Sequence, residues 1–151
     1  LYEQEEYLPP IKEIQLFLQG PKCIIEGSDI TVVGSSYTTL LAKEAAEILK
    51  SEGISAEIID IRVLNPFDPL AIINSVNKTG RLVVVDSGTK TGGFASEVIT
   101  SICETIDVKT LKCPPTRVTL ENAPAPTSKF LEKDYYITKE DVVRAVKEQL
   151  Y

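Results

Sequence analysis

The sequence contains no histidine, and this absence removes several kinds of catalytic site at once. Without an imidazole there is no histidine-based zinc site, no Ser–His or Cys–His nucleophile pair, and no histidine acid–base chemistry. Chemistry performed by this chain alone must therefore use carboxylates, lysine, tyrosine or cysteine. Cysteine is scarce too: Cys23, Cys103 and Cys113 form no close pair. This spacing suits neither a disulfide framework nor a zinc site, and it predicts reduced thiols in an intracellular protein.

Long apolar runs are also missing, since no stretch approaches the roughly 20 consecutive apolar residues that a membrane span needs. The formal net charge of −6 argues against nucleic-acid binding and leaves room for a basic partner. We therefore expect neither a membrane nor a nucleic acid among the partners. The chain begins at Leu1 without a methionine or a secretory signal, which suggests a processed chain or a piece of a longer one.

What the sequence does contain is a regular alternation of strand-like and helix-like segments. Apolar, β-branched stretches predict strands within residues 22–26, 30–33, 56–61, 81–86 and 116–120. Helical spacing and capping residues predict helices that begin near Ser35, Ser36 or Thr38, at Asp68 with Pro69, at Ala95, and at Thr138 with Asp141. The first two helices are predicted to end at Gly53 and Gly80.

This alternation predicts an α/β domain with a mostly parallel sheet and helices on both faces. A reversal of strand order would place a crevice at the carboxyl ends of two neighbouring strands, for which we choose 30–33 and 81–86. We predict that residues 21–151 form the domain. Residues 1–20 are predicted to be an extended lead-in or linker.

The segment 87–93, Ser-Gly-Thr-Lys-Thr-Gly-Gly, lies between a predicted strand and a predicted helix, as phosphate-binding loops do. It lacks the P-loop pattern, because Gly93 or Phe94 stands where the lysine belongs, and it lacks the dinucleotide pattern G-x-G-x-x-G. We therefore interpret Gly92 and Gly93 as residues that permit a tight turn and close backbone approach. The loop is predicted to contact a domain rather than hold an anion, although the helix start can still bind a carboxylate from a neighbouring domain.

Five segments follow one another at familiar distances: "EGSDITVVG", "AEIIDIRVLNPFD", "KTGRLVVVD", "TGGFASEV" and "TRVTLENAPAPTSKFLEKDYYITKEDVVRAVKEQL". With them the chain resembles, from about Gly27 to its end, the C-terminal domain of 2-oxo acid dehydrogenase beta subunits of the pyruvate or branched-chain type. That domain belongs to the transketolase C-terminal-like family. The resemblance implies a three-layer α/β/α fold with five strands, the first antiparallel to the rest. It extends to transketolase and 1-deoxyxylulose-5-phosphate synthase, and a stand-alone interaction module of the same fold is a further alternative.

The resemblance implies a parent enzyme that uses thiamine diphosphate and magnesium to decarboxylate a 2-oxo acid oxidatively, and that passes the acyl group to lipoyl groups. The N-terminal domain that meets the cofactor's aminopyrimidine, and the diphosphate motif of the alpha subunit, are absent from this sequence. We therefore expect this chain alone to be inactive, with no catalytic residue and no bound cofactor or metal. The implied partners are a second copy, the N-terminal domain, the alpha subunit and the subunit-binding domain of the lipoyl acyltransferase. The implied location is the cytoplasm in bacteria, and the mitochondrion or plastid in eukaryotes.

Candidate contact residues lie at the ends of strands and helices. Arg62 is either a strand-end arginine or a contact at a domain or subunit boundary. Glu97 lies in the first turn of a helix, where the helix dipole stabilises a carboxylate. The Pro-Ala-Pro segment at 124–126 is either a rigid surface connection or a strap along the subunit contact. The interface candidates are Arg62, Gly92, Gly93, Phe94, Glu97, Pro124 and Pro126.

Overall fold

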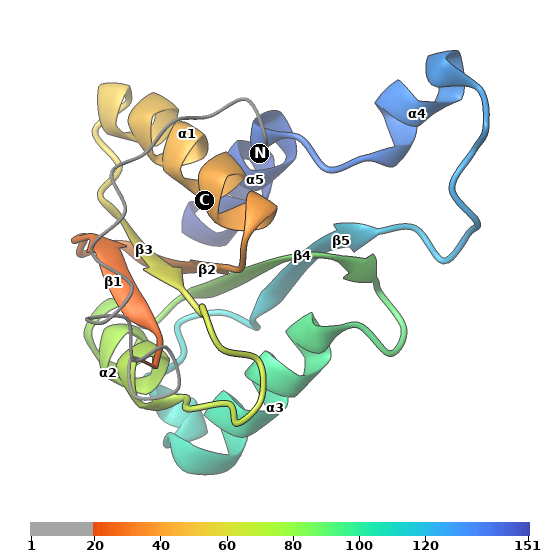
Figure 1. Ribbon diagram of the computed structural model, residues 1–151. Coiled ribbons are helices and arrows are strands. Elements are labelled where there is room, and N and C mark those ends of the chain that lie inside the picture. The colour runs from red at the N-terminus through yellow and green to blue at the C-terminus, as the bar shows by residue number, and fades with distance from the viewer. Residues whose placement is uncertain (1–19) are drawn as a thin grey trace, which may run out of the picture.

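The computed structural model describes residues 20–151, and Figure 1 shows a central sheet with helices on both faces. The strands are β1 Lys22–Ile25, β2 Ile30–Gly34, β3 Ala56–Asp60, β4 Leu82–Thr89 and β5 Thr116–Leu120. The helices are α1 Tyr37–Ser51, α2 Leu70–Thr79, α3 Phe94–Thr105, the short 3-10 helix η3 Val108–Thr110, α4 Lys129–Tyr135 and α5 Lys139–Leu150. The predicted lead-in lies outside the described residues apart from Gly20, so the boundary at residue 21 stays a prediction.

The strand order confirms the predicted topology. The sheet has five strands in the order β1-β3-β2-β4-β5, so β1 and β5 are its edges. Strand β1 pairs antiparallel with β3, and every other neighbouring pair is parallel. The order reverses between β2 and β4, the two strands chosen from the sequence. The carboxyl ends of β2, β3 and β4 therefore meet at one edge of the sheet, where ligands and partners bind in folds of this kind.

Both faces of the sheet are buried, which explains why the central strands are continuously apolar. Val32 and Val83 pack in the core beneath α1 and α5. Val33 and Val84 face the other way and pack in a second core with α2 and α3. Because successive side chains of a strand point to opposite faces, a strand covered on both sides needs apolar residues throughout.

Two local predictions differ from the structure, and two helices were not predicted. Strand β4 continues to Thr89 across an irregularity after Asp86, so the predicted loop 87–93 is shortened to residues 90–93. Ser36 lies at the N-cap position of α1, but its side chain makes no capping hydrogen bond. The Thr38 hydroxyl, and not that of Ser36, makes the hydrogen bonds at the start of α1. It accepts from the amide of Ser35 at 2.9 Å and lies 2.9 Å from the carbonyl of Val85. Helices α4 and η3 were not predicted.

The predicted capping box at the start of α5 is confirmed. The amide of Thr138 donates to Asp141 Oδ2 at 2.9 Å, and the amide of Asp141 donates to Thr138 Oγ1 at 3.4 Å. Burial alone would raise the pKa of the Asp141 carboxyl. Hydrogen bonds from Thr138, together with the charge of the Arg144 guanidinium, outweigh burial and lower this pKa below its ordinary value.

We expect Asp141→Ala to lower the free energy of unfolding by about 1 kcal/mol at neutral pH, because the box satisfies two otherwise free amide groups. Since the folded pKa of Asp141 is depressed, its contribution is present above pH 3.8 and is lost as the pH falls through the lower folded value. Urea unfolding at neutral pH and near pH 3 measures this. The exposed neighbour Glu140→Ala is the control, and an equal loss in both variants would contradict the assignment.

Candidate contact site

Two turns meet at the carboxyl edge of the sheet. One turn leads from β3 to α2, and the other leads from β4 to α3. The rings of Phe67 and Phe94 join them, with centroids 5.4 Å apart and an interplanar angle of 83°. Both rings pack against the core that lies between the sheet and α2 and α3. The two turns therefore share one apolar base.

Asp86 organises the turn after β4. Its Oδ1 accepts from the amide of Gly88 at 2.9 Å, and its Oδ2 accepts from the amide of Ala95 at 2.8 Å. The second bond satisfies an amide in the first turn of α3, where a bound phosphate would otherwise accept. The chain's own carboxylate therefore occupies this position, which supports a contact turn over an anion cradle.

Glycine is required at residues 92 and 93 for two different structural reasons. Gly92 has a φ of 74°, a backbone conformation that L residues rarely adopt, and a Cβ there would meet nothing within 4 Å. Gly93 has an extended backbone, but a Cβ there would lie 2.3 Å from the carbonyl oxygen of Thr89 and 2.9 Å from Asp86 Oδ2. Gly92 thus permits the turn, and Gly93 permits the close approach of backbone to backbone.

Arg62 follows β3, in the residues where the chain bends into the first of these turns. Its φ is 58°, and the amide of Val63 donates across it to the carbonyl of Ile61 at 2.6 Å. The Arg62 Nε donates to the carbonyl of Gly20 at 3.1 Å, so the guanidinium holds the start of the described chain. Glu97 is exposed in the first turn of α3.

Sequence reasoning missed the backbone strain at this edge. Ser36, with φ 52° and ψ −122°, and Arg62 are the only non-glycine residues with positive φ in the described part of the chain. They follow β2 and β3, where Gly34 and Asp60 are partners in the sheet. The Thr39 hydroxyl bonds Asp60 Oδ1 at 3.1 Å and helps to hold this corner. Each strained residue costs on the order of 1–3 kcal/mol, so the surrounding structure must fix both turns.

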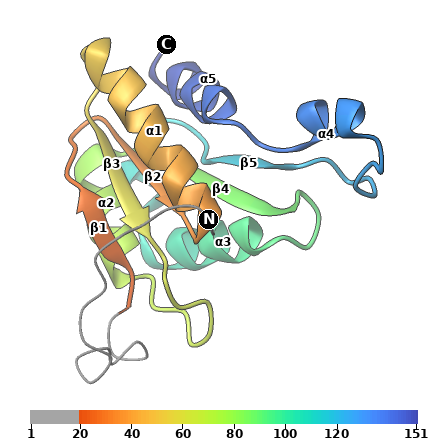
Figure 2. The same cartoon turned by 45° about the horizontal axis from the view of Figure 1, so that its top comes forward.

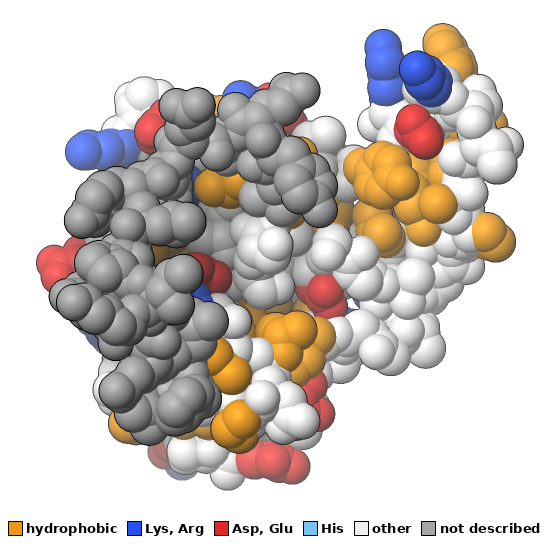
Figure 3. Space-filling view, in the orientation of Figure 1, with side chains coloured by type: hydrophobic (Ala, Val, Ile, Leu, Met, Phe, Trp, Pro, Cys, Tyr) orange, Lys and Arg blue, Asp and Glu red, His pale blue; other side chains and the backbone are white. Residues whose placement is uncertain are grey.

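A second surface is the projecting segment 121–136, which we call the arm. Figures 1 and 2 show the arm leaving the body after β5, carrying α4 and returning to α5. Phe130 is 79% exposed, Leu131 53% and Tyr136 50%. Figure 3 shows hydrophobic side chains gathered on the arm at the upper right. The Tyr135 hydroxyl donates to the carbonyl of Ala123 at 2.8 Å and ties the two ends of the arm together.

The structure therefore divides the predicted contact residues into two groups. The carboxyl edge holds one group, and the arm holds the other, in which Pro124 is exposed and Pro126 is half-buried. The sequence signal for the arm was the apolar pair Phe130-Leu131 in a charged stretch that fits no predicted core. The group at the carboxyl edge is Arg62, Gly92, Gly93, Phe94 and Glu97.

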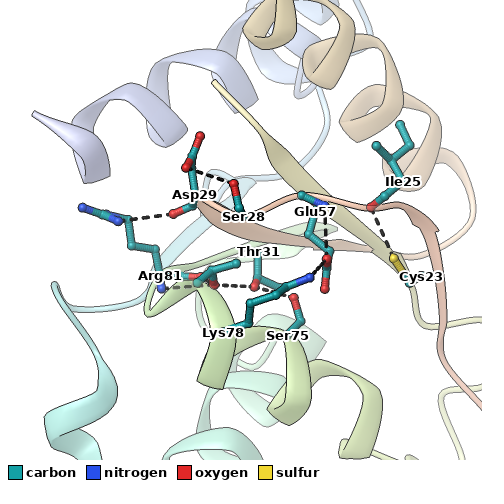
Figure 4. Close-up of polar contacts among 11 residues, drawn as sticks. Cys23, Ile25, Ser28, Asp29, Thr31, Glu57, Ser75, Lys78 and Arg81 are labelled. Atoms are coloured by element: carbon teal, nitrogen blue, oxygen red, sulfur yellow. Dashed lines mark hydrogen bonds and ion pairs between the residues drawn. The ribbon is translucent and has the colours of Figure 1, made fainter. Parts of the chain in front are cut away.

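A buried polar cluster lies near the amino ends of β2 and β3, away from the carboxyl edge (Figure 4). Glu57 of β3 is buried, pairs with Lys78 of α2, and accepts from the amide of Gly27 at 3.1 Å. Burial alone would raise the pKa of the Glu57 carboxyl, but Lys78, a hydrogen bond from Ser75 and the Gly27 amide lower it. The hydroxyl of Thr31 lies 2.6 Å from that of Ser75.

This cluster fastens α2 to the sheet. No buried side-chain nitrogen or oxygen atom lacks a hydrogen-bond partner in residues 20–151. Across the same residues, no three His, Cys, Asp or Glu side chains are grouped so that they could hold a metal ion. The helices described here include none long and apolar enough to cross a membrane.

Comparison with known proteins gives the following matches. The family described as "Transketolase, C-terminal domain" matches residues 22–142. The mitochondrial pyruvate dehydrogenase E1 component subunit beta of Dictyostelium discoideum is 36% identical over 146 residues, which cover 96% of this chain and 38% of that protein. The mitochondrial 2-oxoisovalerate dehydrogenase subunit beta 2 of Arabidopsis thaliana is 33% identical over 144 residues, 95% of this chain and 37% of that protein. The chain thus spans well under half the length of these relatives.

Among solved structures, a split-gene transketolase described as an inactive beta4 tetramer matches with a TM-score of 0.72 at 30% sequence identity. The match covers 86% of this chain and 41% of that one. It confirms the predicted α/β fold.

Proposed function

The chain belongs to the transketolase C-terminal domain family, and we propose that it is the partner-contact domain of a thiamine-diphosphate-dependent 2-oxo acid dehydrogenase beta subunit. In this proposal the parent enzyme oxidatively decarboxylates a 2-oxo acid and passes the acyl group to lipoyl groups. This chain contributes surfaces rather than chemistry. Relatives of both the pyruvate and the 2-oxoisovalerate type support the general class of substrate.

The observation that carries the proposal is the exposure of the arm. A phenylalanine that is 79% exposed, beside a leucine that is 53% exposed, leaves apolar area in water that a partner would bury. Phe130 and Leu131 lie on α4, whose seven residues include none that is buried. We propose that a second copy of the chain covers this surface. The assembly named for the split-gene transketolase, a beta4 tetramer, supports self-association.

The carboxyl edge of the sheet is the second contact surface in this proposal. The turns joined by Phe67 and Phe94 would meet the parent's N-terminal domain or its alpha subunit. The net charge of −6 suits a basic partner, for which we propose the subunit-binding domain of the lipoyl acyltransferase. The named mitochondrial relatives support an intracellular location, in the mitochondrion for a eukaryotic protein.

The residues at the carboxyl edge do not fit thiamine diphosphate. The Asp86 carboxylate accepts from the Ala95 amide, at the start of the helix where a diphosphate would need donors, and it would repel one. We therefore propose that the cofactor and its magnesium bind to other parts of the parent enzyme. A transketolase-type parent is the second candidate, favoured by the 30% identity to the split-gene transketolase.

Sedimentation velocity over a concentration series tests self-association. We expect reversible association of the wild-type chain at high micromolar concentration, which is weak because one arm buries less than a standard interface. Phe130→Glu should raise the dissociation constant at least tenfold, about 1.4 kcal/mol, because it places a charge in the apolar contact. Val108→Glu is the matched control, since Val108 is 63% exposed on η3, outside the arm. A wild-type chain that stays monomeric at millimolar concentration would refute the proposed contact.

A further inference from the structure

The turn after β4 and the arm are joined by a reciprocal side-chain pair. The amide of Thr91 donates to Asn122 Oδ1 at 3.1 Å, and Asn122 Nδ2 donates to Thr91 Oγ1 at 3.0 Å. Asn122 therefore uses its acceptor and a donor on one residue, which fixes the orientation of its side chain. Thr91 lies in the turn of the carboxyl edge, and Asn122 is at the start of the arm.

Arg117 of β5 strengthens the same connection. Its Nη1 donates to the carbonyl of Lys90 at 2.8 Å and to Ser96 Oγ at 2.7 Å, so one guanidinium holds both the turn and the first part of α3. The amide of Lys90 donates to the carbonyl of Leu120 at 3.2 Å. The amide and carbonyl of Lys90 and the amide of Thr91 thus all bond to β5 or to the arm.

Asn122 and Thr91 are both exposed, so their pair is not part of either core. Exposed hydrogen bonds contribute little to global stability, because water competes for the same donors and acceptors. What they do here is order the turn and hold it against the arm before any partner binds. Pre-ordered surfaces associate more tightly because less conformational freedom is lost on binding.

We infer that Asn122 and Arg117 are positioning residues that clamp the arm to the turn after β4, so that the arm meets a second copy of this chain in a fixed orientation. This inference rests on the proposed self-association through the arm. The clamp fixes the orientation of the arm relative to the carboxyl edge of the sheet, although the two groups of contact residues lie on different elements. The Tyr135 hydroxyl donates to the carbonyl of Ala123 and so ties the end of the arm to its start, beside Asn122. The apolar residues of α4 are thereby held relative to the turn.

Amide hydrogen exchange followed by NMR tests the clamp in the monomer, at low concentration. Asn122→Leu keeps the size of the side chain and removes its polar atoms. We expect exchange of the Thr91 amide to become at least tenfold faster, while core amides such as that of Val84 keep their rates. Asn122→Asp should retain the slow rate, because its carboxylate can accept from both the amide and the hydroxyl of Thr91. Asn74→Leu, on the exposed side of α2, is the control.

Sedimentation of the same variants tests the coupling. The dissociation constant of Asn122→Leu should rise at least fivefold although the arm residue Phe130 is intact, and Asn122→Asp should restore it. Unchanged exchange at Thr91 in Asn122→Leu would overturn the clamp, and faster exchange with unchanged association would overturn the coupling. A monomeric wild-type chain would instead refute the proposed self-association, and with it the coupling, while exchange still reports on the clamp.

Discussion

Gly93→Ala is expected to lower the free energy of unfolding by about 3 kcal/mol, because the new methyl group has no space. Its Cβ would lie 2.3 Å from the carbonyl oxygen of Thr89, a backbone atom that cannot move without distorting the end of β4. Overpacking of this kind typically costs about 1–3 kcal/mol and occasionally more, and backbone neighbours place it at the upper end. The hydrogen bond from Ala95 to Asp86 would be strained at the same time, because the methyl group would also lie 2.9 Å from Asp86 Oδ2.

Gly92→Ala is the matched control for this prediction. It adds the same atom one residue earlier, where a Cβ would meet nothing within 4 Å and only the φ of 74° is unfavourable. We expect a loss of about 1 kcal/mol for this change. Urea unfolding of both variants, followed by circular dichroism, measures the difference. Equal losses would show that the turn relaxes around Gly93 and that the close approach is not required.

Lys78→Met is expected to destabilise the chain by about 2 kcal/mol at neutral pH, because it leaves the Glu57 carboxylate buried without a cation. Removing one partner of a fully buried pair costs about 3–5 kcal/mol. The side chain of Lys78 is 49% exposed, so water screens part of the interaction and the lower value is appropriate. Only 7% of the Glu57 side chain is exposed, so an unpaired carboxylate there still destabilises the folded chain.

The pH dependence of this stability loss shows whether it comes from the unpaired charge of Glu57. The folded pKa of Glu57 is below 4.5, so the carboxylate contributes stability above pH 4.5 and loses this contribution as the pH falls through the folded value. In Lys78→Met, the Glu57 carboxyl loses the cation that helps to lower its pKa, so its pKa should be higher than in the wild type and protonation relieves the unpaired charge. The difference between wild type and variant should therefore narrow in acid. Lys50→Met, at an exposed lysine of α1, is the control. A loss that does not change with pH would point to packing rather than charge.

Much of the fold was predictable from the sequence, because burial on both faces requires apolar residues that the strands show directly. The segments that form β2 and β4 were predicted to be neighbours in the sheet, and they are. The role of Gly93 was also predictable, since adjacent glycines between strand and helix indicate a tight turn and close backbone approach. The contact role of Gly93 stays a prediction.

The arm could not be predicted in the same way, because helix patterns are recognised by a face that packs on a core. Phe130 and Leu131 of α4 are both exposed. The strained φ of Ser36 left no signal in the sequence, since serine is an ordinary helix-capping residue and only the corner between β2 and α1 imposes the conformation. The extension of β4 through Gly88 was missed because glycine normally interrupts strands, whereas here β5 supplies a partner for Thr89.

The place of β5 at the edge of the sheet bears on aggregation. An open edge strand is a template on which other chains can stack into fibrils, and this hazard grows with the length of the strand. Here the strand has five residues, with Pro114 and Pro115 just before it and Pro124 and Pro126 soon after it. Because proline has no amide hydrogen, these flanking residues limit how far strand pairing with another molecule can extend along this edge. The β5 edge is therefore a poor template for fibril growth.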